Sequence, residues 1–140
     1  MSRDTLALST PRLPIRRTFE HGILWERTLH SAGYNVELYK SKVSEEPLGV
    51  KAQKILSKVS GLVIANYDDI RSPVPLDRYN ITQIQFAQRF RLPVFLELYP
   101  DDDLLPVTSL LGARTSDVLA DAEVIPFYGD MDIIRERLES

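Results

Sequence analysis

The chain has 140 residues, of which 44% are hydrophobic and 26% charged, and we expect one domain spanning residues 1–140. It contains no cysteine and two histidines, which excludes a disulfide scaffold, a zinc–thiolate site and a thiol nucleophile and makes a metal site unexpected. Its net charge of −3 comes from dispersed residues, so we expect no nucleic acid polymer as a partner.

The apolar segments indicate which cellular compartment to expect for the protein. The longest runs, such as Leu62–Ala65, are far shorter than the ~20 residues that a membrane helix needs. Met1–Ser9 lacks the apolar stretch and cleavage site of a signal peptide. We therefore expect a cytoplasmic protein that has no membrane partner.

The first quarter of the chain predicts a strand, a helix and a second strand. Thr5–Ser9 is an apolar run typical of a strand, and Thr10–Arg17 is a loop with two prolines and three arginines. A helix follows from Thr18, its predicted N-cap, to Gly33, its predicted C′ residue. Alternation in Asn35–Tyr39 then favours a strand near a sheet edge.

The next segment predicts a loop, a helix and a buried strand. Ser41–Gly49 is polar, and Gly61 closes a helical stripe formed by Ala52, Ile55, Leu56 and Val59. Leu62–Ala65 is apolar at every position, which indicates a strand covered on both faces. The loop Asn66–Asn80 follows.

The second half repeats this alternation. A third helical stripe is formed by Ile81, Ile84, Ala87 and Phe90. Leu92–Leu98 predicts a buried strand, and Asp101–Ala122 a long excursion with a short helix around Val107–Leu111. Glu123–Tyr128 predicts the last strand, and Asp130 the N-cap of a final helix.

This order predicts a doubly wound, flavodoxin/Rossmann-like α/β fold, with a five-stranded parallel sheet and helices on both faces. Ligands of such sheets bind beyond the carboxyl ends of the strands, so three loops are candidates: Ser9–Arg17, Asn66–Asn80 and Tyr99–Leu119. Neither GxGxxG nor GxxxxGK[ST] occurs, which argues against a dinucleotide or P-loop site, and we expect no cofactor.

The candidate loops carry chemical groups that allow two interpretations each. Asp68, Asp69 and Asp77 could hold ribose hydroxyls or act as general acids, or could simply form turns. From spacing alone, Asn80 to Gln83 resembles a capping box. The loop arginines could bind a phosphate or could be solvated.

For three residues of the first predicted helix we predict only the degree of burial. We expect His21 and His30, on different faces of the first helix, to be surface or partly packed residues. We expect Trp25 to lie in the core.

Five segments together resemble the nucleoside 2-deoxyribosyltransferase-like family, which includes the 2′-deoxynucleoside 5′-phosphate N-hydrolases. They are Gly61–Asp69, Asp77, Gln83–Ala87, Leu92–Asp101 and Leu105–Ala113. That family places a Glu six residues after an Asp, and an Ala four residues beyond the Glu. Here these positions hold Asp77, Gln83 and Ala87. TIR domains are a weaker similarity, because they also place a catalytic Glu early in the helix after the third strand.

The resemblance implies a nucleoside or nucleoside 5′-monophosphate as partner, and cleavage or transfer at its N-glycosidic bond. Asp77, with Asp68 or Asp69, would orient the sugar and assist the leaving group, and Gln83 would face the anomeric carbon. The phosphate would be received by Ser9, Thr10, Arg12, Arg16 and Arg17. Tyr79 stands where the family has a small-residue turn, and would contact the substrate.

Gln83 is the main departure from the family, because an amide cannot replace a carboxylate that attacks or stabilises an anomeric carbon. The change would be either a natural loss or an engineered Glu→Gln replacement. The alternatives to an N-glycosidase or deoxyribosyltransferase are therefore a non-catalytic nucleotide-binding or interaction module, and a TIR-like NAD hydrolase.

The resemblance also implies a homo-oligomer, since relatives usually complete the pocket from a neighbouring subunit. The first helix favours a homodimer because its apolar residues span more than one face: Phe19, Ile23, Leu24, Trp25 and Leu29.

Overall fold

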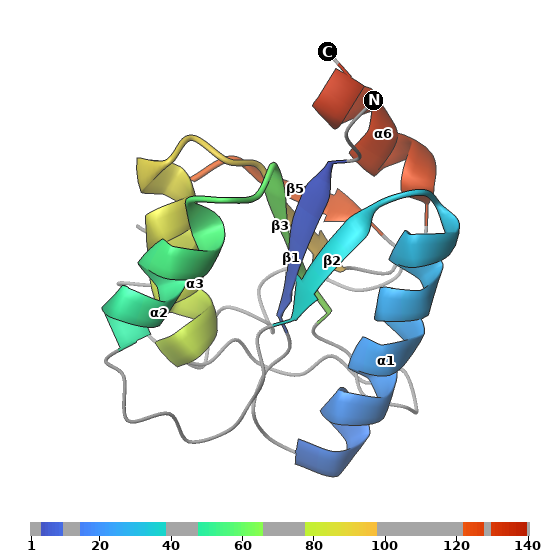
Figure 1. Cartoon of the computed structure of the whole chain (residues 1–140), viewed down its shortest axis with the longest axis horizontal. Coiled ribbons are helices and arrows are strands. Elements are labelled where there is room, and N and C mark those ends of the chain that lie inside the picture. The colour runs from blue at the N-terminus through green and yellow to red at the C-terminus, as the bar shows by residue number, and fades with distance from the viewer. Residues whose placement is uncertain are drawn as a thin grey trace.

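A computed structural model describes residues 4–9, 15–38, 48–65, 78–97, 122–127 and 130–139. Within them, five strands form one parallel sheet in the order β2-β1-β3-β4-β5 (Figure 1). The strands are β1 (Thr5–Ser9), β2 (Asn35–Leu38), β3 (Gly61–Ile64), β4 (Val94–Glu97) and β5 (Val124–Phe127). The helices are α1 (Ile15–Ser31), α2 (Leu48–Leu56), α3 (Arg78–Arg89) and α6 (Met131–Glu139). The predicted doubly wound fold is confirmed, and β2 lies at an edge as expected.

Helices cover both faces of the sheet, α1 and α6 on one side and α2 and α3 on the other (Figure 1). Because successive strand residues point to opposite faces, β1, β3, β4 and β5 contribute to both cores, whereas the edge strand β2 contributes Val36 to the core of α1 and α6. In β1, Leu8 packs in the core of α1 and α6, whereas Ala7 packs in the core of α2 and α3. By the same alternation, Ser9 lies on the α2 and α3 face, while Glu97 follows Phe95 on the α1 face.

The strand register brings the carboxyl ends of three strands to one level. Ser9 is in register with Ile64 of β3, and Ile64 with Leu96 of β4. Glu97 therefore lies one residue beyond the level of Ser9, on a strand two positions away. Helix α1 follows β1 and runs back along the sheet, so its N-terminus lies on the carboxyl-end side of the sheet and extends beyond the strand ends (Figure 1).

Three helices begin earlier than the sequence pattern predicts. Helix α1 starts before Thr18, the predicted N-cap, α2 starts inside the predicted loop Ser41–Gly49, and α3 starts before Ile81. The first turn of a helix has N–H groups that make no intrahelical bond, and it need not add to the apolar stripe. Apolar periodicity therefore detects a helix about one turn late.

The predicted end of the first helix is confirmed. Gly33 has a φ of 98°. Its N–H donates to the carbonyl of His30 at 3.0 Å, and the N–H of Tyr34 donates to the carbonyl of Leu29 at 3.1 Å. This pair of bonds is the Schellman motif, which requires a left-handed residue and so favours glycine. It turns the chain from α1 into β2.

The final helix begins as expected. The backbone N–H of Asp132 donates to Oδ1 of Asp130 at 3.0 Å, so Asp130 caps α6. The predicted excursion Asp101–Ala122, with its helix at Val107–Leu111, lies outside the described residues except for Ala122.

Candidate functional site

Two residues assigned to one site from the sequence, Ser9 and Gln83, meet at the carboxyl end of β1. Ser9 Oγ donates a hydrogen bond to Gln83 Oε1 at 2.5 Å, and Asn80 Nδ2 donates to Ser9 Oγ at 3.2 Å. All three side chains are buried, and Gln83 is only 4% exposed. We call these residues the Ser9 cluster, a directed chain of hydrogen bonds that runs from Asn80 through Ser9 to Gln83.

Helix α3 supplies two members of the Ser9 cluster because residues three apart share a helix face. That face is held against the sheet by Ile84 and Ala87, both fully buried. The capping-box interpretation of Asn80 to Gln83 is wrong. Asn80 already lies inside α3, and Gln83 gives its side-chain oxygen to Ser9 rather than to a helix end. Local spacing could not reveal this contact, because its partners are 74 residues apart.

The remaining predicted site residues are described in part or not at all. Those outside the described residues are Thr10, Arg12, Asp68, Asp69 and Asp77. The backbone of Arg16, Arg17 and Tyr79 is described, and their side chains are not. Arg16 and Arg17 lie in the first turn of α1, not in the predicted loop. That turn contains no acidic residue, so no carboxylate in it neutralises the positive N-terminal end of the helix dipole.

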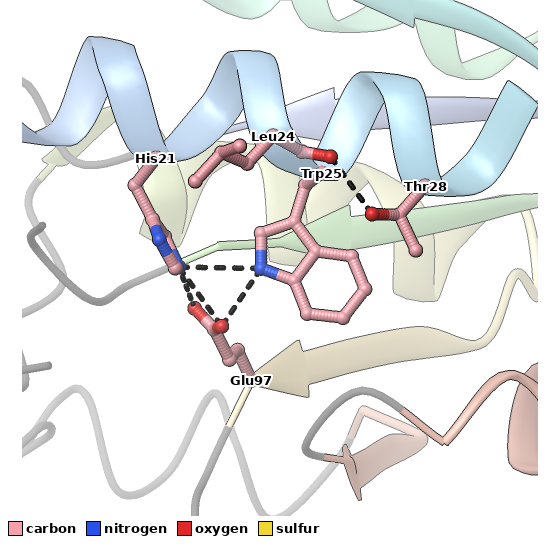
Figure 2. Close-up of polar contacts among 5 residues, drawn as sticks. All are labelled: His21, Leu24, Trp25, Thr28 and Glu97. Atoms are coloured by element: carbon pink, nitrogen blue, oxygen red, sulfur yellow. Dashed lines mark hydrogen bonds and ion pairs between the residues drawn. The ribbon is translucent and has the colours of Figure 1, made fainter.

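A second polar group lies at the end of β4, on the opposite face of the sheet. Glu97 is 0% exposed, and its carboxylate oxygens lie 2.7 and 2.9 Å from Nε2 of His21 (Figure 2). Trp25 Nε1 donates to Glu97 Oε2 at 2.7 Å. We call these three residues the Glu97 cluster. It joins α1 to β4 across 76 residues of sequence.

The Glu97 cluster was not foreseen from the sequence. Trp25 is a core residue as expected, but His21 is buried rather than at the surface or partly packed. A buried carboxylate requires hydrogen-bond donors, and the imidazole and indole supply them from one face of α1. One signal was available: Glu97 is a single charge in the apolar run Leu92–Leu98, so it had to find a partner inside the fold.

The two clusters offer different chemistry. The Ser9 cluster is neutral, and its terminal amide can donate to a ligand oxygen. The Glu97 cluster is a carboxylate–imidazole pair, an arrangement that fixes the orientation and tautomer of a histidine. On its inner side it is closed by Trp25, which makes an edge contact with Phe127 at 5.0 Å between ring centroids. Within the described ranges, no three His, Asp or Glu side chains are grouped as metal ligands.

Comparison with protein-family models and with curated proteins finds no match. Among solved structures, the chain is similar to a conserved protein from Enterococcus faecalis V583, with a TM-score of 0.60 and 9% identity. The match covers 99% of this chain and 98% of that chain. None of the described helices has the length and apolar character needed to cross a membrane. At 9% identity the similarity establishes the fold alone: a doubly wound α/β sheet.

Proposed function

We propose that this chain binds a nucleoside or nucleoside 5′-monophosphate at the carboxyl edge of β1 and β3, without cleaving its N-glycosidic bond. The observation that carries the proposal is the buried hydrogen bond from Ser9 to Gln83. In sheets with this strand order, ligands bind where successive connections leave toward opposite faces, which here is between β1 and β3. Ser9 is the last residue of β1 and lies at that point.

The direction of the hydrogen bonds supports binding rather than catalysis. Because Asn80 donates to Ser9, the Ser9 hydroxyl proton points to Gln83 Oε1, and the amide N–H groups of Gln83 remain for other acceptors. Such a group can donate to an oxygen of the sugar or base, but it is not a nucleophile. A carboxylate at position 83 could accept the Ser9 bond with one oxygen and attack the anomeric carbon with the other.

The N-terminus of α1 favours the monophosphate over the free nucleoside. Its first turn contains Arg16 and Arg17 and no acidic residue, and it lies beyond the strand ends on the carboxyl-end side of the sheet, the side on which β1 ends. Helix N-termini attract anions through free N–H groups and the helix dipole, and arginine adds charge-assisted hydrogen bonds to phosphate. The proposed ligand therefore has its sugar at the Ser9 cluster and its phosphate at the start of α1.

A thermal-shift comparison tests the proposed phosphate site. At equal concentrations, a nucleoside 5′-monophosphate should raise Tm more than the matching nucleoside, because tighter binding to the folded state stabilises it more. Replacing Arg16 and Arg17 together by Gln should remove this difference. Equal shifts for the two ligands in the unchanged protein would contradict a phosphate site.

Release of free base tests the chemistry. The unchanged protein should release no base from a panel of nucleosides, their 5′-monophosphates and NAD, whereas Gln83→Glu should gain release and Gln83→Ala should not. Base release by the unchanged protein would contradict the non-cleaving proposal. A folded Gln83→Glu variant that binds ligand and stays inert would show that position 83 does not face the anomeric carbon.

A further inference from the structure

The Glu97 cluster has no part in the contacts proposed above, yet its hydrogen bonds indicate which ring nitrogen of His21 carries a proton. Trp25 Nε1 can only donate, and an ionised Glu97 can only accept. His21 Nε2 lies 2.7 Å from the carboxylate, so this nitrogen carries the proton that joins them. Trp25 Nε1 and His21 Nε2 lie 3.2 Å apart because both nitrogens donate to the same Glu97 carboxylate. A neutral imidazole in this arrangement has its lone pair on Nδ1.

That lone pair has no hydrogen-bond partner in the part of the chain that the structure describes. The His21 side chain is 10% exposed, and Figure 2 shows its second ring nitrogen on the side away from the Trp25 indole. His21 lies one helical turn before Trp25 and therefore closer to the N-terminus of α1, which is at the carboxyl edge. The imidazole thus places an oriented acceptor on the ligand-binding side of the sheet.

The Ser9 and Glu97 clusters flank the carboxyl end of β3 from opposite faces. Their strands are separated by β3 alone, which corresponds to roughly 10 Å at two strand spacings. In register they differ by one residue. An elongated ligand lying across the end of β3 can therefore reach both.

We propose that His21 is a ligand-contacting residue whose Nδ1 accepts a hydrogen bond from a sugar hydroxyl of the bound nucleoside, and that Glu97 and Trp25 are its positioning residues. This inference rests on the proposed function. A neutral imidazole nitrogen requires a donor, and a phosphate dianion offers acceptors only, whereas a sugar hydroxyl can donate. Fixing the tautomer through a buried carboxylate keeps Nδ1 available for that donor.

Nitrogen-15 NMR of the imidazole rings tests the proposal directly, because the chain has two histidines. The free protein should show His21 with its proton on Nε2. A saturating nucleoside, or its 5′-monophosphate, should shift the Nδ1 signal of His21. Inorganic phosphate should not shift it. His30 is the internal reference, since its side chain is 51% exposed on the same helix and its signals should stay unchanged.

The outcomes separate this inference from the proposed function. Calorimetry that detects saturable nucleoside binding, together with an unmoved Nδ1 signal of His21, overturns the inference and leaves the proposed function intact. A proton found on Nδ1 in the free protein also overturns it. Calorimetry that detects no binding of nucleoside or monophosphate overturns both.

Glu97→Gln distinguishes ligand contact from a merely structural role. The amide oxygen can still accept from Trp25, while its N–H can donate to His21 Nε2 and so drives the imidazole proton to Nδ1. We expect that tautomer change and roughly tenfold weaker nucleoside binding, measured below the Tm of the variant. Glu26→Gln, which removes the partly exposed carboxylate near His30, is the matched control and should change neither. Unchanged affinity in a Glu97→Gln variant with a shifted tautomer overturns the inference. If that variant does not fold, the titration of the unchanged protein decides alone.

Discussion

The Ser9 and Glu97 clusters occupy equivalent places on opposite faces of one sheet, and they differ in charge. Each begins at the last residue of a strand, and Ser9 and Glu97 are 1% and 0% exposed. The Glu97 cluster buries a carboxylate, which is tolerated only with donors on its oxygens. The Ser9 cluster uses neutral groups, whose hydrogen bonds a ligand can exchange at low cost. We therefore interpret the Glu97 cluster as the one that fastens α1 to the sheet and positions an imidazole, and the Ser9 cluster as the one at which the proposed ligand would bind.

The largest effect should come from Glu97→Ala. It removes the acceptor of two buried donors, on His21 and Trp25, and leaves a cavity. We expect a loss of about 3–5 kcal/mol in the free energy of unfolding, measured with urea. Leu24→Ala, at a position 59% exposed on the same helix, should cost less than about 0.5 kcal/mol. A loss below about 1 kcal/mol for Glu97→Ala would show that the charged cluster does not fasten α1.

Ser9→Ala should have an intermediate effect. The change removes one oxygen and leaves the Asn80 and Gln83 side chains without a bond that each makes to Ser9. We expect a loss of about 1–3 kcal/mol in urea unfolding. Ser57→Ala is the control, because that hydroxyl makes an exposed bond to a backbone carbonyl and should matter little. A loss in the free energy of unfolding equal to that of Glu97→Ala would contradict the proposed difference between the two faces.

An exposed ion pair should contribute less than either buried cluster. Arg137 donates to Glu123 at 2.5 and 2.8 Å, and this hydrogen bonding holds the pKa of Glu123 below its ordinary value. The stabilisation is complete above the ordinary value of 4.5 and is lost as pH falls through the lowered pKa. Because the Glu123 side chain is 45% exposed, Glu123→Gln should cost less than about 1 kcal/mol, and less still in high salt. A salt-independent cost of several kcal/mol would contradict this ranking.

The smallest expected energy is the coupling between the two clusters in the free energy of unfolding, measured without ligand. No atom of one cluster is bonded to the other in the described residues, and the sheet separates them. The unfolding costs of Ser9→Ala and Glu97→Gln should therefore add to within about 0.5 kcal/mol in the double variant. Coupling well above that value would show that the faces are not independent.

The sheet was predictable from the sequence because buried strands are short, mostly apolar runs. Leu62–Ala65 is such a run, and the structure places β3 at its position in the middle of the sheet. Helix starts were less predictable, as Thr18 shows, because a first turn adds little to an apolar stripe. Gly33 was recognisable as a helix end because the left-handed conformation there favours glycine.

The candidate site was predictable in part. The family resemblance placed Ser9 and Gln83 in one site, and the fold brings their side chains into contact. Local spacing alone pointed instead to a capping box from Asn80 to Gln83, since local rules cannot detect a partner on another element. The pairing of Glu97 with His21 was missed for the same reason, although a lone charge in a buried strand is a usable signal.

The most direct test of the proposed binding site follows the side-chain amide of Gln83 by NMR while a nucleoside 5′-monophosphate is added. Gln85 is the reference, because it is exposed on the same helix. Binding at the Ser9 cluster predicts that the Gln83 N–H signals shift and saturate with the ligand, while those of Gln85 stay in place. Saturable binding that leaves the Gln83 signals unmoved, or no binding at millimolar ligand, would contradict the proposed site.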